Sequence, residues 1–159
     1  MMLKHSNSSL AAVLCLALLA AACGSDDSTP TAPTPAVTLT GTWAGMFNGA
    51  LIQGDGQAEL TQTGTNVTGE WSAPMPQPLI LLGAPDIDLF GPAEGTVNGT
   101  SATITMRFNE AFVSYFGSAD CGLEAEVTFN ETTLEGSWMN NEHCQPPAVD
   151  SGTLSFTRQ

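Results

Sequence analysis

From residue 37 onward, apolar and polar residues alternate along most of the chain. In residues 37–47, for example, Leu39, Trp43 and Phe47 fall on one set of alternate positions, with threonines on the other. A period of two residues is typical of a β-strand with one buried and one solvated face. No stretch shows a convincing period of 3.6 residues. The alternation predicts strands at residues 37–47, 57–62, 67–72, 93–97, 101–108, 111–116, 122–129, 132–139 and 151–157.

Short polar segments rich in glycine and asparagine separate these runs, and we expect each to be a turn. Examples are Asn48-Gly49, Gly54-Asp55-Gly56 and residues 63–66. Eight or nine short strands joined in order by hairpin-sized turns predict an all-β domain, a single up-and-down antiparallel barrel of about eight strands. Closure of the sheet removes the exposed strand edges. A β-sandwich is the alternative.

Residues 73–92 interrupt the alternation. Five prolines in this segment exclude a central strand and a long helix. Its middle contains the apolar run Leu79-Ile80-Leu81-Leu82. A connection of this length in a compact domain is usually functional or docked on the body of the fold. We therefore expect the run either to plug one end of the barrel or to form a lid or a partner-facing patch.

The first 22 residues have the three parts of a secretory signal. Lys4 supplies positive charge, residues 10–22 are uninterruptedly apolar, and the small residues Ala20, Ala21 and Ala22 precede Cys23. The apolar run is shorter than the roughly 20 residues that span a bilayer. We therefore expect residues 1–22 to be a cleaved signal peptide.

The segment from Leu19 to Cys23 resembles the lipobox of bacterial lipoproteins, in which the cysteine is lipidated and becomes the mature N-terminus. The resemblance implies lipidation at Cys23, a lipid bilayer as partner, and a location in the cell envelope. Gly24, which follows the cysteine, favours the outer membrane if the organism has one. Residues 23–36, rich in Ser, Thr, Asp and Pro, then form a flexible tether, and residues 37–159 form the barrel domain. The alternative is an ordinary signal peptide cut elsewhere, with Cys23 a free thiol.

The expected mature chain is strongly acidic. Loss of Lys4 with the signal takes the formal net charge from −13 to −14, because sixteen Asp and Glu remain against Arg107 and Arg158. So few cations cannot neutralise a phosphate backbone, which excludes nucleic acid as a partner. The same charge disfavours direct docking on an anionic membrane surface.

Of the four cysteines in the chain, Cys15 leaves with the signal and Cys23 takes the lipid, so Cys121 and Cys144 remain. In an exported protein we expect this pair to form a disulfide. If residues 130–133 form a hairpin loop, Phe129 faces Leu134. The same register places Cys121 opposite Glu142, which is two residues from Cys144. The bridge would then close the open end of this hairpin.

Gly-x-Trp occurs three times, at residues 41–43, 69–71 and 136–138. The first copy resembles the opening strand of calycin barrels, the lipocalin and avidin-like group, where an early Gly-x-Trp strand packs the closed end of the barrel. The polar residues of biotin binders have no match here, so biotin binding is not implied. The tryptophans either pack the core or line a cavity for a small apolar ligand. The candidate ligand-binding residues are Trp43, Trp71, Trp138, Leu79 and Leu81.

Catalytic, metal and cofactor sites find little support in the sequence. His143 is the only histidine after the signal, and it lies beside Cys144. Glu124 and Glu126 share one strand face that alternates with apolar residues, which predicts that both are solvated. Asp86-Ile87-Asp88 lacks the spacing of a calcium loop. We predict no enzyme activity, no catalytic residues, no metal and no cofactor.

Two functions follow from these expectations. In the first, we expect the chain to be an anchored, non-enzymatic lipoprotein that binds a small apolar ligand in its barrel. Alternatively, it is a structural or interaction lipoprotein with a filled barrel and an envelope protein as partner.

Overall fold

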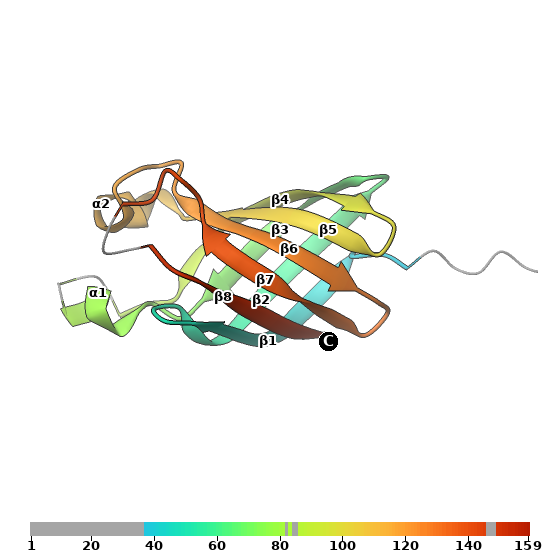
Figure 1. Ribbon diagram of the computed structural model, residues 1–159, viewed down its shortest axis with the longest axis horizontal. Coiled ribbons are helices and arrows are strands. Elements are labelled where there is room, and N and C mark those ends of the chain that lie inside the picture. Colours follow the sequence, from blue (N-terminus) through green and yellow to red (C-terminus); the bar gives the residue numbers. More distant parts are fainter. Residues whose placement is uncertain (1–36, 82, 84–85, 146–148) are drawn as a thin grey trace, which may run out of the picture. The chain divides into compact units, whose positions relative to one another are not determined.

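The computed structural model describes residues 37–81, 83, 86–145 and 149–159, and the expected signal peptide, Cys23 and tether lie outside this part. The described residues form eight strands in a closed barrel, and each strand is antiparallel to the next (Figure 1). Strand β8 pairs with β1 to close it. The predicted up-and-down barrel is therefore confirmed, and the sandwich is not the fold. The strands are β1 (Gly41–Gly49), β2 (Gln53–Thr63), β3 (Asn66–Ala73), β4 (Leu89–Asn98), β5 (Ser101–Arg107), β6 (Gly122–Phe129), β7 (Thr133–Asn140) and β8 (Ser151–Arg158).

The two-residue alternation places apolar side chains inside the barrel. In β6, for example, Leu123, Ala125 and Val127 are buried, and the residues between them are exposed. The β6–β7 register pairs Phe129 with Leu134, as the sequence predicts. Burial of one face of every strand fixes this register, because a slip of one residue would turn all the apolar side chains outward.

The glycines near the start of β2 do not form the predicted turn. The β1–β2 turn lies earlier, where the Gly49 N–H donates to the Ile52 carbonyl at 2.9 Å. Gly56 belongs to the strand, because a Cβ there would lie 2.4 Å from the ring of Phe47. This glycine makes room for an aromatic side chain inside the barrel. Its presence here therefore reflects packing and not the turn that the sequence predicted.

The strand predicted at residues 111–116 is also wrong. A 3₁₀ turn, η1 (Glu110–Phe112), and a short helix, α2 (Val113–Phe116), occupy this segment. Phe112 and Phe116 are both buried. They lie four residues apart, a spacing that puts side chains on one face of a helix and equally on one face of a strand, so the pattern of apolar residues did not separate the two structures.

Strand β4 begins at Leu89, four residues before the predicted start, and it contains Pro92. Its pairing with β5 begins only at Ala93, whereas its pairing with β3 extends back to Leu89. Pro92 therefore lies where β4 pairs with β3 alone, and a missing N–H is tolerated there.

The two ends of the barrel differ in their connections (Figure 1). At one end, here called the turn end, two or three residues join β2 to β3, β4 to β5, and β6 to β7. The opposite end, here called the loop end, carries the β1–β2 turn and three longer connections. These include helix α1 (Gln77–Leu81), the η1–α2 segment, and the segment between β7 and β8.

Aromatic side chains cluster around Phe47 inside the barrel. Phe47 makes edge contacts with Trp71, Trp138 and Phe156 at centroid distances of 6.2, 6.1 and 5.2 Å. Phe108 stacks on Phe116 of α2 at 4.1 Å, which joins the loop-end cap to the core. Edge and offset contacts of this kind add to the free energy of burial.

Candidate functional site

Trp43, the first predicted ligand-binding residue, lies fully buried at the turn end. Its Nε1–H donates to the Leu39 carbonyl at 2.9 Å, and the Arg158 guanidinium carbon lies 4.5 Å from the ring centroid. Arg158 also donates to the carbonyls of Thr40, at 2.8 Å, and Thr38. The indole thus has protein atoms on its polar edge and a cation over its face. This arrangement seals the turn end and leaves no free indole surface.

Trp71 and Trp138 lie together around Phe47, and their side chains are also buried. Their indole N–H groups donate to backbone carbonyls, those of Arg107 at 3.0 Å and Thr153 at 3.2 Å. A hollow between Ala58, Ala93 and Ala125, among others, has a volume of about 20 Å³. That volume is about the size of one water molecule, far below the ~300 Å³ of a small-molecule site.

Leu79 and Leu81, the other predicted ligand-binding residues, have opposite environments on α1. Leu79 is buried in the core cluster, whereas Leu81 is 86% exposed. The Pro76 carbonyl accepts the Leu79 and Ile80 N–H groups at 2.9 and 3.3 Å, which begins the helix immediately after that proline. The sequence left a plug and an exposed patch as alternatives for the whole run; Leu79 is buried as a plug would be, whereas Leu81 is exposed as a patch would be. Leu82 lies outside the described residues.

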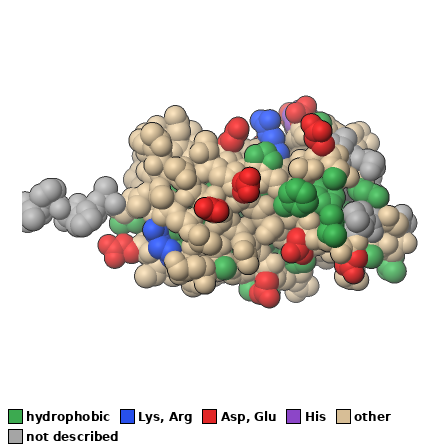
Figure 2. Space-filling view, turned by 180° about the vertical axis from the view of Figure 1, so that it is seen from behind, with side chains coloured by type: hydrophobic (Ala, Val, Ile, Leu, Met, Phe, Trp, Pro, Cys, Tyr) green, Lys and Arg blue, Asp and Glu red, His purple; other side chains and the backbone are tan. Residues whose placement is uncertain are grey.

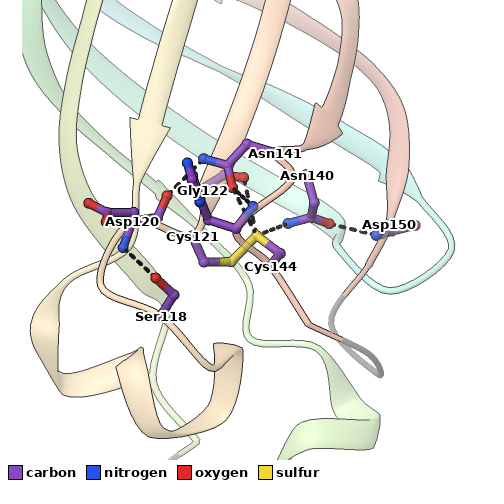
Figure 3. Close-up of a disulfide and its surroundings, with 9 residues drawn as sticks. Ser118, Asp120, Cys121, Gly122, Asn140, Asn141, Cys144 and Asp150 are labelled. Atoms are coloured by element: carbon purple, nitrogen blue, oxygen red, sulfur yellow. Dashed lines mark hydrogen bonds between the residues drawn. A yellow bond between two sulfur atoms is a disulfide. The ribbon is translucent and has the colours of Figure 1, made fainter.

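The predicted disulfide joins Cys121 to Cys144 at the loop end (Figure 3). Around it, the Asn141 side-chain amide donates to the Asp120 carbonyl at 2.8 Å, and the Asn140 amide donates to Cys144 Sγ at 3.4 Å. The Asp150 N–H donates to Asn140 Oδ1 at 2.6 Å. This network ties the β7–β8 connection to the start of β6, so Cys144 is not available as a nucleophile.

Asp150 is a buried carboxylate that the sequence did not single out. Its Oδ1 accepts the Ala50 N–H at 3.0 Å, and its Oδ2 accepts those of Leu51 and Ile52 at 2.8 and 2.9 Å. These three donors form the β1–β2 turn, far from Asp150 in sequence. A single charge therefore holds two loop-end segments together, a structural role.

An outer groove of about 230 Å³ lies over β1 to β4, and its lining includes Glu59, Glu70 and Phe90. Phe90 is 42% exposed, and its ring contacts that of Phe112 edge-on at 5.5 Å. Glu59 and Glu70 lie directly opposite each other in the β2–β3 register. This groove was not predicted from the sequence, although the turn predicted at residues 63–66 brings these two glutamates into register.

The acidic side chains give no metal site among the described residues, where no group of three or more His, Cys, Asp or Glu could hold an ion. Asp86 and Asp88 are exposed, as are Glu124 and Glu126 on the outer face of β6, where the sequence placed them. In the same part of the chain, no helix is long and apolar enough to cross a membrane.

Searches against protein-family models, curated proteins and solved structures find no match for this chain.

Proposed function

We propose that this chain is a non-enzymatic lipoprotein of the bacterial envelope, held in the bilayer by an acylated Cys23, whose calycin-like barrel is a scaffold for binding another protein. The observation that supports a scaffold is the packed interior. The three tryptophans expected to line a ligand cavity are at most 3% exposed. Their indole N–H groups already have backbone acceptors.

Binding of a small apolar molecule inside the barrel, the other function expected from the sequence, has less support. A ligand of ordinary size would need several hundred Å³, and the hollow among Ala58, Ala93 and Ala125 has about 20 Å³. Opening such a space would displace the contacts between Phe47 and its aromatic neighbours. Loss of these contacts would cost several kcal/mol.

Exposed apolar side chains favour a protein partner at the loop end. The five most exposed large hydrophobic residues of the described chain all lie there or on adjoining strand ends. Viewed from behind, hydrophobic side chains gather toward this end of the molecule, with acidic side chains around them (Figure 2). Apolar surface that stays in water usually marks a contact site. These residues are Leu81 (86% exposed), Met139 (58%), Val149 (57%), Ile87 (50%) and Phe90 (42%).

The chain enters the barrel at the opposite end. The Leu39 N–H donates to the side chain of Gln62, near the β2–β3 turn, at 2.9 Å. An anchor at Cys23 would therefore pull on the turn end and leave the apolar loop end away from the point of attachment. That polarity suits a protein that presents one end to a partner.

Two measurements test the proposal. In cells fed a clickable palmitate analogue, the wild-type chain should be labelled and found in the membrane fraction, whereas Cys23→Ser should be unlabelled. Native mass spectrometry of the secreted Cys23→Ser chain should give the mass of the polypeptide alone. A bound molecule of defined mass that dissociates on denaturation would refute the scaffold role and restore the ligand-binding alternative.

A further inference from the structure

Glu59 and Glu70 form a like-charge pair on the outer face of the barrel. They are direct cross-strand partners and both are exposed. At such positions the Cβ atoms lie about 4.5–5.5 Å apart, and two negative charges destabilise the sheet. Elsewhere in the described strand pairings, glutamates lie opposite uncharged residues. These are Glu94, Glu124, Glu126 and Glu135.

The pair has no compensating cation in its groove. Among the described residues that line the groove, none is basic. Of the two arginines that follow the expected signal peptide, Arg158 is bound at the turn end over Trp43. Arg107 does not line the groove. The arrangement costs stability in the isolated chain, and a positive charge from outside would relieve that cost.

Phe90 supplies the second element of the site. It lines the same groove as the two glutamates, and 42% of its surface is exposed. The ring is held in place from behind, by Phe112, and its backbone carbonyl accepts the Asn109 N–H at 2.8 Å. A fixed aromatic ring beside carboxylates suits an arginine or lysine side chain, which gains a cation–π contact as well as charge neutralisation.

The segment that precedes Phe90 in the sequence also exposes apolar and acidic side chains. Ile87 is 50% exposed and is flanked by the exposed Asp86 and Asp88, and Leu81 is 86% exposed on α1. Apolar side chains thus alternate with acidic ones along the segment that leads into Phe90. A complementary surface would present basic side chains around an apolar centre.

We propose that the Phe90 surface, defined as Glu59, Glu70, Ile87 and Phe90, docks a protein partner that seats an arginine or lysine side chain between the two glutamates. This inference rests on the proposed scaffold function and names the partner by its chemistry. A second copy of the chain does not fit, because two surfaces from a chain of formal charge −13 repel each other. An anionic lipid surface is disfavoured for the same reason.

Site-specific photo-crosslinking in intact cells tests the proposal on the full-length protein. p-Benzoylphenylalanine replaces Ile87, and Thr103 on the outer face of β5 is the control position, because it too is exposed. The expected result is a protein adduct from position 87 and none from position 103. The adduct's crosslinked peptide should contain arginine or lysine beside apolar residues.

Charge variants separate binding from folding. In a chain with the probe at position 87, Glu59→Gln together with Glu70→Gln should lower the adduct yield about tenfold. The melting temperature should stay the same or rise, because the like-charge repulsion is gone. The matched control, Glu124→Gln with Glu126→Gln, removes the same charge from a face without a glutamate pair, and its adduct yield should be unchanged.

Several results would overturn the proposal. These are no adduct from position 87, equal adducts from positions 87 and 103, an adduct with lipid or with a second copy, or a yield that is insensitive to the Glu59 and Glu70 substitutions. An adduct from position 103 alone, with no ligand in native mass spectrometry, would refute docking at the Phe90 surface. It would not contradict the scaffold role. A ligand in native mass spectrometry would instead refute the scaffold role itself.

Discussion

Replacing Asp150 with alanine removes the carboxylate that holds the β1–β2 turn to the β7–β8 connection. Asp150 is 9% exposed and accepts three backbone N–H groups, from Ala50, Leu51 and Ile52. The alanine variant would leave the Ile52 donor buried without an acceptor, whereas the Ala50 and Leu51 donors are partly exposed and could find water. The loss is therefore unequal among the three bonds.

The expected cost follows from these environments. A buried hydrogen bond to a charged group contributes about 2 kcal/mol, and each of the two partly hydrated bonds contributes about 1 kcal/mol. Asp150→Ala should therefore lower the free energy of unfolding by about 4 kcal/mol. In Asp150→Asn, the amide oxygen can still accept the two bonds now made by Oδ2, and only the Ala50 bond is lost. That variant should lose about 1–2 kcal/mol.

Urea denaturation followed by tryptophan fluorescence measures both losses, since all three tryptophans are buried and report on the core. With a slope of about 2 kcal/mol per molar urea, the alanine variant should shift the midpoint by about 2 M. Asp55→Ala and Asp55→Asn, at an exposed position of β2, are the matched controls and should shift it little. A loss below about 1 kcal/mol for Asp150→Ala, or equal losses for both Asp150 variants, would refute the reasoning.

Three further predictions use the same assay. Reduction of the Cys121–Cys144 disulfide should cost about 3 kcal/mol, and a midpoint that does not respond to reductant would contradict it. Gly136→Ala should cost at least about 2 kcal/mol, because its Cβ would lie 2.0 Å from a carbonyl oxygen of β6; a variant as stable as wild type would contradict that close approach. Arg158→Met should cost about 2 kcal/mol by removing the cation over Trp43 and two hydrogen bonds, with a changed near-ultraviolet circular dichroism spectrum as a second readout.

The barrel was predictable because its determinants are local. Each strand buries one face, so the alternation of apolar residues marks the strands, and a short turn fixes the register of a hairpin. The pairing of Phe129 with Leu134 follows from these two facts alone. The predictions that were wrong concern residues whose conformation depends on contacts with another element. Gly56 accommodates Phe47 from β1, and Phe112 and Phe116 reach back into the barrel from a helical turn.

The candidate site shows the same division. The cysteine pair was predictable from the sequence, whereas the different environments of Leu79 and Leu81 were not, because the apolar run alone does not show which side chain faces the barrel. Whether the barrel is hollow was not predictable either, because filling depends on how the aromatic side chains from different strands meet around Phe47. The role of Asp150 was also out of reach, since its three donors lie about a hundred residues away.

The polarity of the barrel connects the proposed anchor to the proposed docking surface. An extended tether of residues 24–36 would reach at most about 45 Å from the bilayer, and an eight-residue strand adds about 26 Å before its tilt is counted. With the proposed anchor, attachment at the turn end would leave Ile87 and Phe90, which lie at the loop end, on the side of the barrel away from the tether. The turn end is sealed by Arg158 over Trp43, whereas the most exposed apolar residues lie at or beside the loop end. A partner that the barrel captures would therefore be held away from the bilayer surface, at a distance set by the tether.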